Sequence, residues 1–229
     1  VRAEALKEIQ ELFTTGGASP SEVAGTGCLR QLQGCISSKN PQVVATAASV
    51  ITFATREPHA VEQLAEPAYS KAIVTAMEAN TEVAPELAGI VASLAATEKG
   101  KSSLLAADVL KAIAKGISSS NQAIVGDSVR VIELISAGGK PCGQPDAETA
   151  CVFSLVSLLV PSTAAAIRTS ALNSILNLAE REDNRLALLQ SDGSVKNIID
   201  ILQDKASPPD TARAALSLLE KLSHQTQRG

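Results

Sequence analysis

The sequence predicts an all-α fold, a right-handed α-α superhelix made of stacked helical repeats. Apolar residues recur at steps of four, four and three, which places them on one face of a helix with 3.6 residues per turn. This pattern occurs six times, and its first members are 40 to 44 residues apart. A period of about 40 to 47 residues is typical of helical solenoids. The content of aromatic residues is only 2%, and many apolar residues are Ala and Leu, which favour closely packed helices.

Each of the six patterns predicts one long helix. Their first members are Val1, Val43, Val83, Ile124, Ile167 and Thr211. A second series of apolar residues, also spaced for one helical face, follows each of the first five patterns and begins at Leu29, Ser70, Leu110, Val152 and Val195. Because two independent series share one period, the period is unlikely to arise by chance.

These patterns predict a single repeat domain over residues 1–229. It consists of a lone helix over 1–13 and five repeats over 14–55, 56–95, 96–136, 137–179 and 180–223. Each repeat contains a short, a medium and a long helix. Asn40, Asn80 and Asn121 stand three residues before their patterns, where a helix N-cap is expected. Gly27 and Gly193 each precede a medium helix.

Two segments and the two ends of the repeat array carry further expectations. Residues 137–147 contain two prolines and three glycines, which predicts an exposed loop in place of a short helix. The charged segment 180–183 mixes acidic and basic residues and is expected to be a solvated loop rather than a metal site. Both ends of the repeat array should be incomplete, so Thr211 is expected near a terminal face and its replacement by Asp should be mild.

The four cysteines do not form a metal-binding motif. They are Cys28, Cys35, Cys142 and Cys151, and no pair has the C-x-x-C spacing of a zinc or redox site. Buried free thiols are the favoured interpretation, with a disulfide between Cys142 and Cys151 as the alternative. A reducing cytosolic compartment agrees best with free thiols.

The fifth repeat carries a resemblance to a known family. The stretch 167–179, followed by Asn184-Arg185 and then by residues 193–202, is similar to an armadillo repeat, and residues 40–54 are similar as well. At the level of period and apolar positions the resemblance covers nearly the whole chain. HEAT repeats have a comparable period but two helices, so the additional short helices favour the armadillo type.

This resemblance implies a binding groove. In armadillo proteins the third helix of each repeat lines a concave groove, where Trp and Asn side chains hold an extended peptide, as in nuclear import adaptors. The positions that correspond to the Asn ladder are Glu11, Phe53, Ser93, Leu134, Asn177 and Lys221. Those that correspond to the Trp ladder are Lys7, Ser49, Gly89, Arg130, Asn173 and Ser217. Only Asn177 matches and the chain has no Trp, which argues against the import-adaptor mechanism. Arg130, Asn173 and Asn177 are the candidate partner-binding residues, and ordinary solvated helix surface is the alternative.

No residue pattern indicates catalysis, a cofactor or a metal site. The two histidines, His59 and His224, are far apart in the sequence, and neither lies beside a plausible nucleophile. Phosphate-binding and dinucleotide-binding glycine motifs and the G-x-S-x-G turn are all missing. The expectation is a protein that is not an enzyme.

The leading functional hypothesis is a protein-protein interaction scaffold or adaptor that binds a helix or an extended segment of another protein. Alternatives are a regulator of a small GTPase, a cochaperone, or the regulatory segment of a larger enzyme. The net charge of −4 argues against nucleic acid, and no apolar run is long enough to span a membrane. A monomer in the cytoplasm is expected, with the nucleus as an alternative location.

Overall fold

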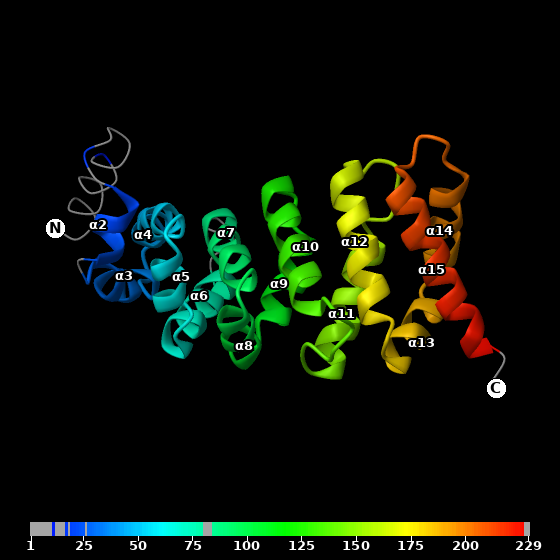
Figure 1. Cartoon of the computed structure of the whole chain (residues 1–229), viewed down its shortest axis with the longest axis horizontal. Helices are drawn as coiled ribbons and strands as arrows, with labels where there is room; N and C mark the ends of the chain where they lie inside the picture. The colour runs from blue at the N-terminus through cyan, green and yellow to red at the C-terminus, as the bar shows by residue number, and fades with distance from the viewer. Residues whose placement is uncertain (1–10, 12–16, 18, 26, 80–83, 227–229) are drawn as a thin grey trace. The chain divides into compact units, whose positions relative to one another are not determined.

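The structure is a computed structural model that describes residues 11, 17, 19–25, 27–79 and 84–226. Its described residues form helices and connecting segments and contain no strand (Figure 1). The predicted all-α solenoid is therefore confirmed. The predicted lone helix over 1–13 lies outside the described residues except for Glu11, and so does the predicted cap Asn80.

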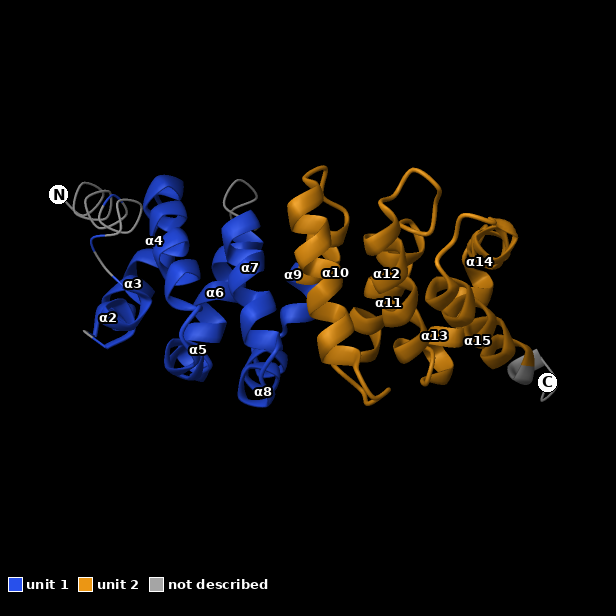
Figure 2. Cartoon of the chain, turned by 45° about the horizontal axis from the view of Figure 1, so that its top comes forward, with its two compact units in different colours: residues 1–112 blue, residues 113–229 orange. Residues whose placement is uncertain are grey.

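The chain divides into two compact units, residues 1–112 and 113–229 (Figure 2). The boundary falls inside one helix, α9, which spans Val109–Ile117. The predicted grouping of the whole chain into one domain of five repeats stays a prediction.

Unit 1 contains seven complete helices among its described residues. They are α2 (Pro20–Gly25), α3 (Cys28–Ile36), α4 (Pro41–Ala54), α5 (Pro58–Leu64), α6 (Pro67–Ala79), α7 (Ala84–Ala95) and α8 (Glu98–Ala106). The long helix α4 packs against α3 on one side and against the next long helix, α7, on the other. Helix α7 in turn contacts α6 and α8.

Unit 2 contains six complete helices among its described residues. They are α10 (Gln122–Ser136), α11 (Pro145–Val156), α12 (Ala165–Leu178), α13 (Glu182–Gln190), α14 (Ser194–Gln203) and α15 (Pro209–Thr226). The long helices contact one another in chain order, α10 with α12 and α12 with α15 (Figure 1). Helix α11 lies against α12 and α13, and α14 lies against α15.

Several helices begin at the residues that the sequence predicts. The side chain of Asn40 accepts a hydrogen bond from the backbone N–H of Gln42, and that of Asn121 from Ala123, at 3.0 and 2.9 Å. Each bond satisfies one of the free N–H groups of a first helical turn. Gly27 and Gly193 precede α3 and α14 with φ angles of 69° and 78°, a backbone conformation that glycine adopts without steric cost.

The apolar patterns of the long helices form the seams between long helices of the same unit. Of the pattern residues whose burial the structure describes, all are buried except Ile167 and Leu219, which are half-buried. Leu87, Ile132 and Ile175 are completely inaccessible to solvent. The first pattern and Val83 lie outside the described residues.

The expectation that Thr211 lies at a tolerant terminal face is wrong. Thr211 is completely buried, and its hydroxyl forms a 2.6 Å hydrogen bond with the hydroxyl of Thr169 on α12. The first residue of the last pattern therefore lies inside the seam between α12 and α15. An Asp at this position would bury a charge and lose the hydrogen bond.

The exposed loop predicted over 137–147 is shorter in the structure, because α11 begins at Pro145, and the loop over 137–144 is anchored by a buried residue. Its Cys142 is only 1% exposed. The backbone N–H groups of Cys142 and Gly143 donate to the carboxylate of Glu148, at 2.7 and 3.0 Å. Glu148 belongs to α11 and is completely buried. The loop is thus fixed to the body of unit 2 by hydrogen bonds to a charged acceptor.

The expectation of a solvated loop over 180–183 is also wrong in part. Helix α13 begins at Glu182, within this segment. The guanidinium of Arg181 lies 3.2 Å from the carboxylate of Glu148, and the side-chain amide of Asn184 donates to the same carboxylate at 3.2 Å. Because a buried carboxylate is tolerated only when it is paired and hydrogen-bonded, these groups explain how Glu148 can be buried.

The four cysteines are free thiols. Cys142 and Cys151 are buried, whereas Cys28 and Cys35 are half-buried. Burial raises the pKa of Cys142 and of Cys151 from 9.0 to about 12, and the nearby Glu148 carboxylate acts in the same direction. Burial also raises the pKa of Cys28.

A charge in the seam should destabilise the chain strongly. We expect Ile132→Asp and Ile175→Asp each to lower the free energy of unfolding by at least about 3 kcal/mol, because each buries an unpaired carboxylate. Thr211→Asp should also be clearly destabilising. Thermal and urea unfolding followed by circular dichroism measure the effect. Leu186→Asp is the control, because Leu186 is 42% exposed. If the Ile132→Asp variant melted like the parent chain, the burial of Ile132 between long helices would be contradicted.

The buried thiols should react slowly with alkylating reagents. At about pH 8, iodoacetamide should alkylate Cys28 and Cys35 much faster than Cys142 and Cys151, because the thiolate is the nucleophile and burial keeps the latter two protonated. In urea all four should react, as peptide mass spectrometry can show. Since these two thiols ionise near 9.0 when unfolded but near 12 when folded, they should also lower stability as the pH rises from 9.0 towards 12. Rapid native alkylation of Cys151 would contradict this assignment.

Candidate functional site

The candidate residues lie on the long helices of unit 2. Arg130 belongs to α10, and Asn173 and Asn177 belong to α12. Arg130 is exposed and both asparagines are half-buried. Because α10 and α12 are in contact, the residues lie on neighbouring elements. Asn173 and Asn177 are four residues apart and therefore share a face of α12.

The structure gives both asparagines a partner on α10. The side-chain amide of Asn173 donates to the carboxylate of Glu133 at 3.0 Å. That of Asn177 donates to the hydroxyl of Ser136 at 3.4 Å. Both bonds use the amide nitrogen, so each carboxamide oxygen remains as an acceptor. Asn173 is thus held in a fixed orientation across the junction of α10 and α12, and Asn177 is oriented by a longer and weaker bond.

Arg130 is not joined to either asparagine by a hydrogen bond in the described structure. It lies on α10 one turn after Asp127, whose pKa is raised by burial and lowered by the positive charge of Arg130, with burial the larger effect. Arg130 and Glu133 are three residues apart on the same helix, so a positive and a negative side chain are neighbours on the surface of α10.

A further contact extends the site towards α15. The ammonium group of Lys221 donates to the carbonyl oxygen of Leu176 at 3.3 Å and pairs with the carboxylate of Glu180. We name the set Arg130, Glu133, Asn173, Asn177 and Lys221 the polar row. Sequence reasoning missed Glu133 because it compared only two positions of each long helix. Glu133 and Asn173 are 40 residues apart, whereas the patterns of α10 and α12 begin 43 residues apart, so a comparison of equivalent positions does not find this pair.

The end of α12 is fixed by side chains of α13. The amide of Asn184 donates to the carbonyl oxygen of Leu178 at 2.9 Å, and the guanidinium of Arg185 donates to those of Ala179 and Glu180, both at 2.8 Å. Carbonyl groups at the end of a helix have no partner within the helix and need such donors. Asn184 also donates to the buried Glu148, so α11, α12 and α13 are connected next to Asn177.

In unit 1 the corresponding positions have different chemistry. Phe53 occupies the ladder position of α4, and the guanidinium of Arg56 lies 5.1 Å from the centre of its ring. Ser93 of α7 donates to the carbonyl oxygen of Gly89 in its own helix. Paired asparagines on one long helix are therefore a feature of unit 2 among the described residues.

The described residues contain neither a metal-binding cluster nor a membrane-spanning helix. No group of three or more His, Cys, Asp or Glu side chains among them is arranged to hold a metal ion. Within the same part of the chain, no helix combines the length and apolar character needed to cross a membrane.

Solved structures support the fold, whereas sequence comparisons find no relative. No protein-family model and no curated protein matches the chain. Computationally designed armadillo repeat proteins for modular peptide recognition are similar in structure, with a TM-score of 0.76 and 18% identity over 95% of this chain and 92% of theirs.

A designed armadillo repeat protein in complex with the peptide (KR)4 is similar with a TM-score of 0.65 and 17% identity, over 86% of this chain and 87% of that protein. An engineered protein matches with a TM-score of 0.71 and 18% identity, over 97% and 90% of the two chains. At such identities the likeness concerns the fold. The chain therefore has an armadillo-like repeat fold, as its repeat pattern predicts.

Proposed function

We propose that the chain is a non-enzymatic interaction module whose polar row binds an extended segment of another protein. The observation that carries this proposal is the orientation of Asn173 by Glu133, together with the longer bond from Asn177 to Ser136 on the same side of α12. A carboxamide that is already oriented loses less side-chain freedom on binding than a mobile one. The likeness to a designed armadillo protein with a bound peptide supports the same class of ligand.

The spacing of the two asparagines suits a peptide backbone. Four residues of helix rise by about 6 Å, and alternate residues of an extended chain are about 6.7 Å apart. Two carboxamide oxygens on α12 can therefore accept from the N–H groups of alternate residues of one extended segment. Backbone binding of this kind is independent of the ligand's side chains.

The charges of the polar row select the ligand's side chains. The exposed guanidinium of Arg130 can bind a carboxylate with two parallel hydrogen bonds. Glu133, next to it on α10, would repel a second acidic residue and favour a basic or neutral one. The ligand should therefore be an extended segment with one acidic residue near Arg130 and mixed charge beyond it, rather than a uniformly acidic one.

A double substitution tests this function. Peptides selected from a random display library against the parent chain should bind Arg130→Glu/Asn177→Ala about 10- to 100-fold more weakly, because a charged and a neutral hydrogen-bonding group are lost. Fluorescence anisotropy with a labelled peptide measures the change. The melting point should stay near the parental value, because Arg130 is exposed and the Asn177 bond is long.

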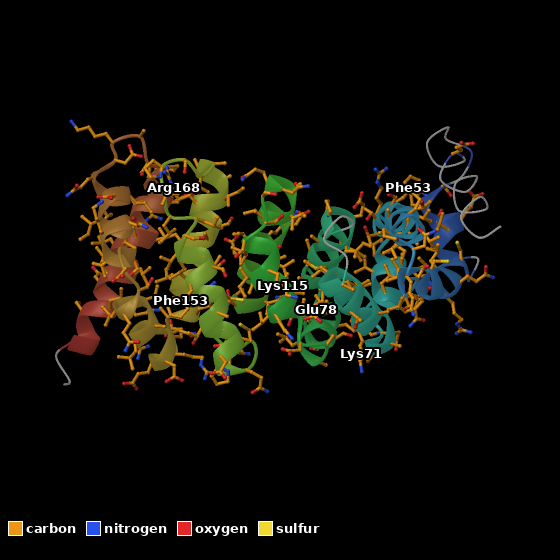
Figure 3. All side chains as sticks on the ribbon, turned by 180° about the vertical axis from the view of Figure 1, so that it is seen from behind. Phe53, Lys71, Glu78, Lys115, Phe153 and Arg168 are labelled. Carbon is orange, nitrogen blue, oxygen red and sulfur yellow. The ribbon has the colours of Figure 1, made fainter. Side chains whose placement is uncertain are left out.

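A matched control separates the polar row from the rest of the surface. Lys71→Glu on α6 makes the same charge reversal at an exposed residue of unit 1 (Figure 3), and it should bind the peptide with parental affinity. Parental affinity of the double variant would show that the polar row is not the binding site. In that case the loop 137–144 would become the better candidate.

A further inference from the structure

Arg168 places a positive charge at a buried position of the long helix α12 (Figure 3). In α4 and α10 the equivalent positions hold Val44 and Val125, which are 0% and 2% exposed. The side chain of Arg168 is only 10% exposed. Because a buried guanidinium is costly unless its N–H groups are paired, Arg168 needs acceptors that the two valines do not need.

The described residues around Arg168 supply few acceptors. Its Nε atom is buried and has no hydrogen-bond partner within the described part of the chain. Its Nη2 atom lies 3.8 Å from the carboxylate of Asp204, which is longer than a hydrogen bond. A guanidinium has five N–H donors, and an unpaired buried polar group calls for an explanation. The site is therefore short of negatively charged acceptors.

A serine hydroxyl lies next to the same carboxylate. The hydroxyl of Ser207 donates to Oδ2 of Asp204 at 3.4 Å, and this is the oxygen that lies near Arg168. The other oxygen, Oδ1, accepts from the backbone N–H of Ala206 at 2.9 Å. A single carboxylate oxygen thus separates the hydroxyl of Ser207 from the guanidinium of Arg168. An anionic group attached to the Ser207 oxygen would take the place of this carboxylate.

The sequence around Ser207 is that of a substrate for proline-directed protein kinases. These enzymes modify a Ser or Thr that stands directly before a proline, and Ser207 is followed by Pro208 and Pro209. Ser207 is half-buried, whereas the residues on both sides of it in the loop between α14 and α15 are exposed. A residue before proline avoids the helical backbone conformation, which keeps Ser207 outside α15.

We propose that Ser207 is a phosphorylation site and that the guanidinium of Arg168 binds its phosphate. The Ser207 oxygen attacks the γ-phosphorus of a nucleoside triphosphate that a protein kinase holds with Mg²⁺. The bond between this phosphorus and the β-phosphate oxygen breaks, and the nucleoside diphosphate leaves with the electron pair. A carboxylate of the kinase accepts the hydroxyl proton. The phosphate brings up to two negative charges and three acceptor oxygens, which the buried guanidinium lacks.

The other charges of the loop do not prevent this pairing. Asp204 would repel the phosphate, but its side chain is 40% exposed and can turn towards solvent once Arg168 has a new partner. Lys205 and Asp210 are both exposed and carry opposite charges. Arg168 is therefore the buried cation that the phosphate meets.

The start of α15 offers a second favourable interaction. The residue before this 18-residue helix is Pro208, whose side chain has no hydrogen-bond acceptor, whereas Asn40 and Asn121 cap α4 and α10. The first turn of a helix has free N–H groups and a partial positive charge, so a phosphate beside it is stabilising. Phosphorylation of Ser207 should thus link the start of α15 to α12.

Phosphorus nuclear magnetic resonance tests the binding of the phosphate. In the full chain carrying phosphoserine at Ser207, the pKa for loss of the second phosphate proton should fall from about 6 to about 5, because a guanidinium favours the doubly charged form. Arg168→Val should return this pKa to about 6. The variant should keep its helix content, because α4 and α10 hold valine at this position. Asp204→Asn should lower the pKa further, because it removes a repelling carboxylate.

Ser19 provides a matched control in unit 1. It is the other serine of the sequence that stands directly before a proline. Its hydroxyl donates to the carboxylate of Glu22 at 3.0 Å, so a phosphate at Ser19 would face a negative charge. The pKa of this phosphate should stay at about 6 or above, and Arg168→Val should leave it unchanged.

Treatment of the unmodified, folded chain with a proline-directed kinase, ATP and Mg²⁺ tests the modification itself. Peptide mass spectrometry should find phosphate on Ser207, and Ser207→Ala should remove that signal. Absence of phosphate from Ser207 would overturn the proposal. So would a phosphate at Ser207 whose pKa is the same with Arg168 and with Arg168→Val, since the guanidinium would then not bind it. Both results are independent of peptide binding by the polar row.

Discussion

The burial of one face of each long helix against the next long helix of its own unit is the constraint on which the rest of the structure depends. It fixes both the distance and the rotation between neighbouring long helices, because a one-residue shift would turn each apolar face by about 100°. Side chains of neighbouring long helices consequently meet. Glu133 and Asn173, 40 residues apart, form a hydrogen bond, and Thr169 and Thr211 do so at 42 residues. The residues of the polar row therefore lie together because burial of the apolar faces brings α10, α12 and α15 into contact.

A second requirement concerns the ends of the long helices. The carbonyl groups at the end of α12 receive donors from Asn184 and Arg185 of α13. Asn184 also binds the buried carboxylate of Glu148, which in turn fixes the loop 137–144. A buried charge is costly unless several donors surround it. Here two backbone N–H groups, an amide and a guanidinium do so, and they place the end of α12, with Asn177, in a defined position.

Much of the fold could be predicted from the sequence because its causes are local or periodic. The caps at Asn40 and Asn121 depend on the residues that follow them directly. The buried faces of the long helices depend on a spacing that the sequence displays. The irregular loop at 137–144 follows from Pro141 and its three glycines, which disfavour a helix.

The features that escaped prediction depend on side chains brought together by folding. From the sequence alone, Glu148 is expected to be an exposed residue of a helix. The four groups that donate to its carboxylate belong to the loop 137–144 and to the start of α13. Arg168 (Figure 3) occupies a seam position that holds Val125 in the preceding long helix, and it is 8% exposed. Its guanidinium lies 3.8 Å from the carboxylate of Asp204, which follows α14. Neither the contacts of Glu148 nor the contact of Arg168 with Asp204 can be predicted from the spacing of residues in the sequence.

The central claim is that the carboxamides of Asn173 and Asn177 bind the backbone of an extended ligand. Nuclear magnetic resonance of the ¹⁵N-labelled chain observes side-chain amide groups individually, and substitution of each asparagine assigns its signals. Titration with a peptide selected against the chain should shift the side-chain signals of Asn173 and Asn177 together with backbone signals of α10 and α12. Saturable binding that leaves both asparagine side chains unchanged and shifts signals of other helices would contradict the account.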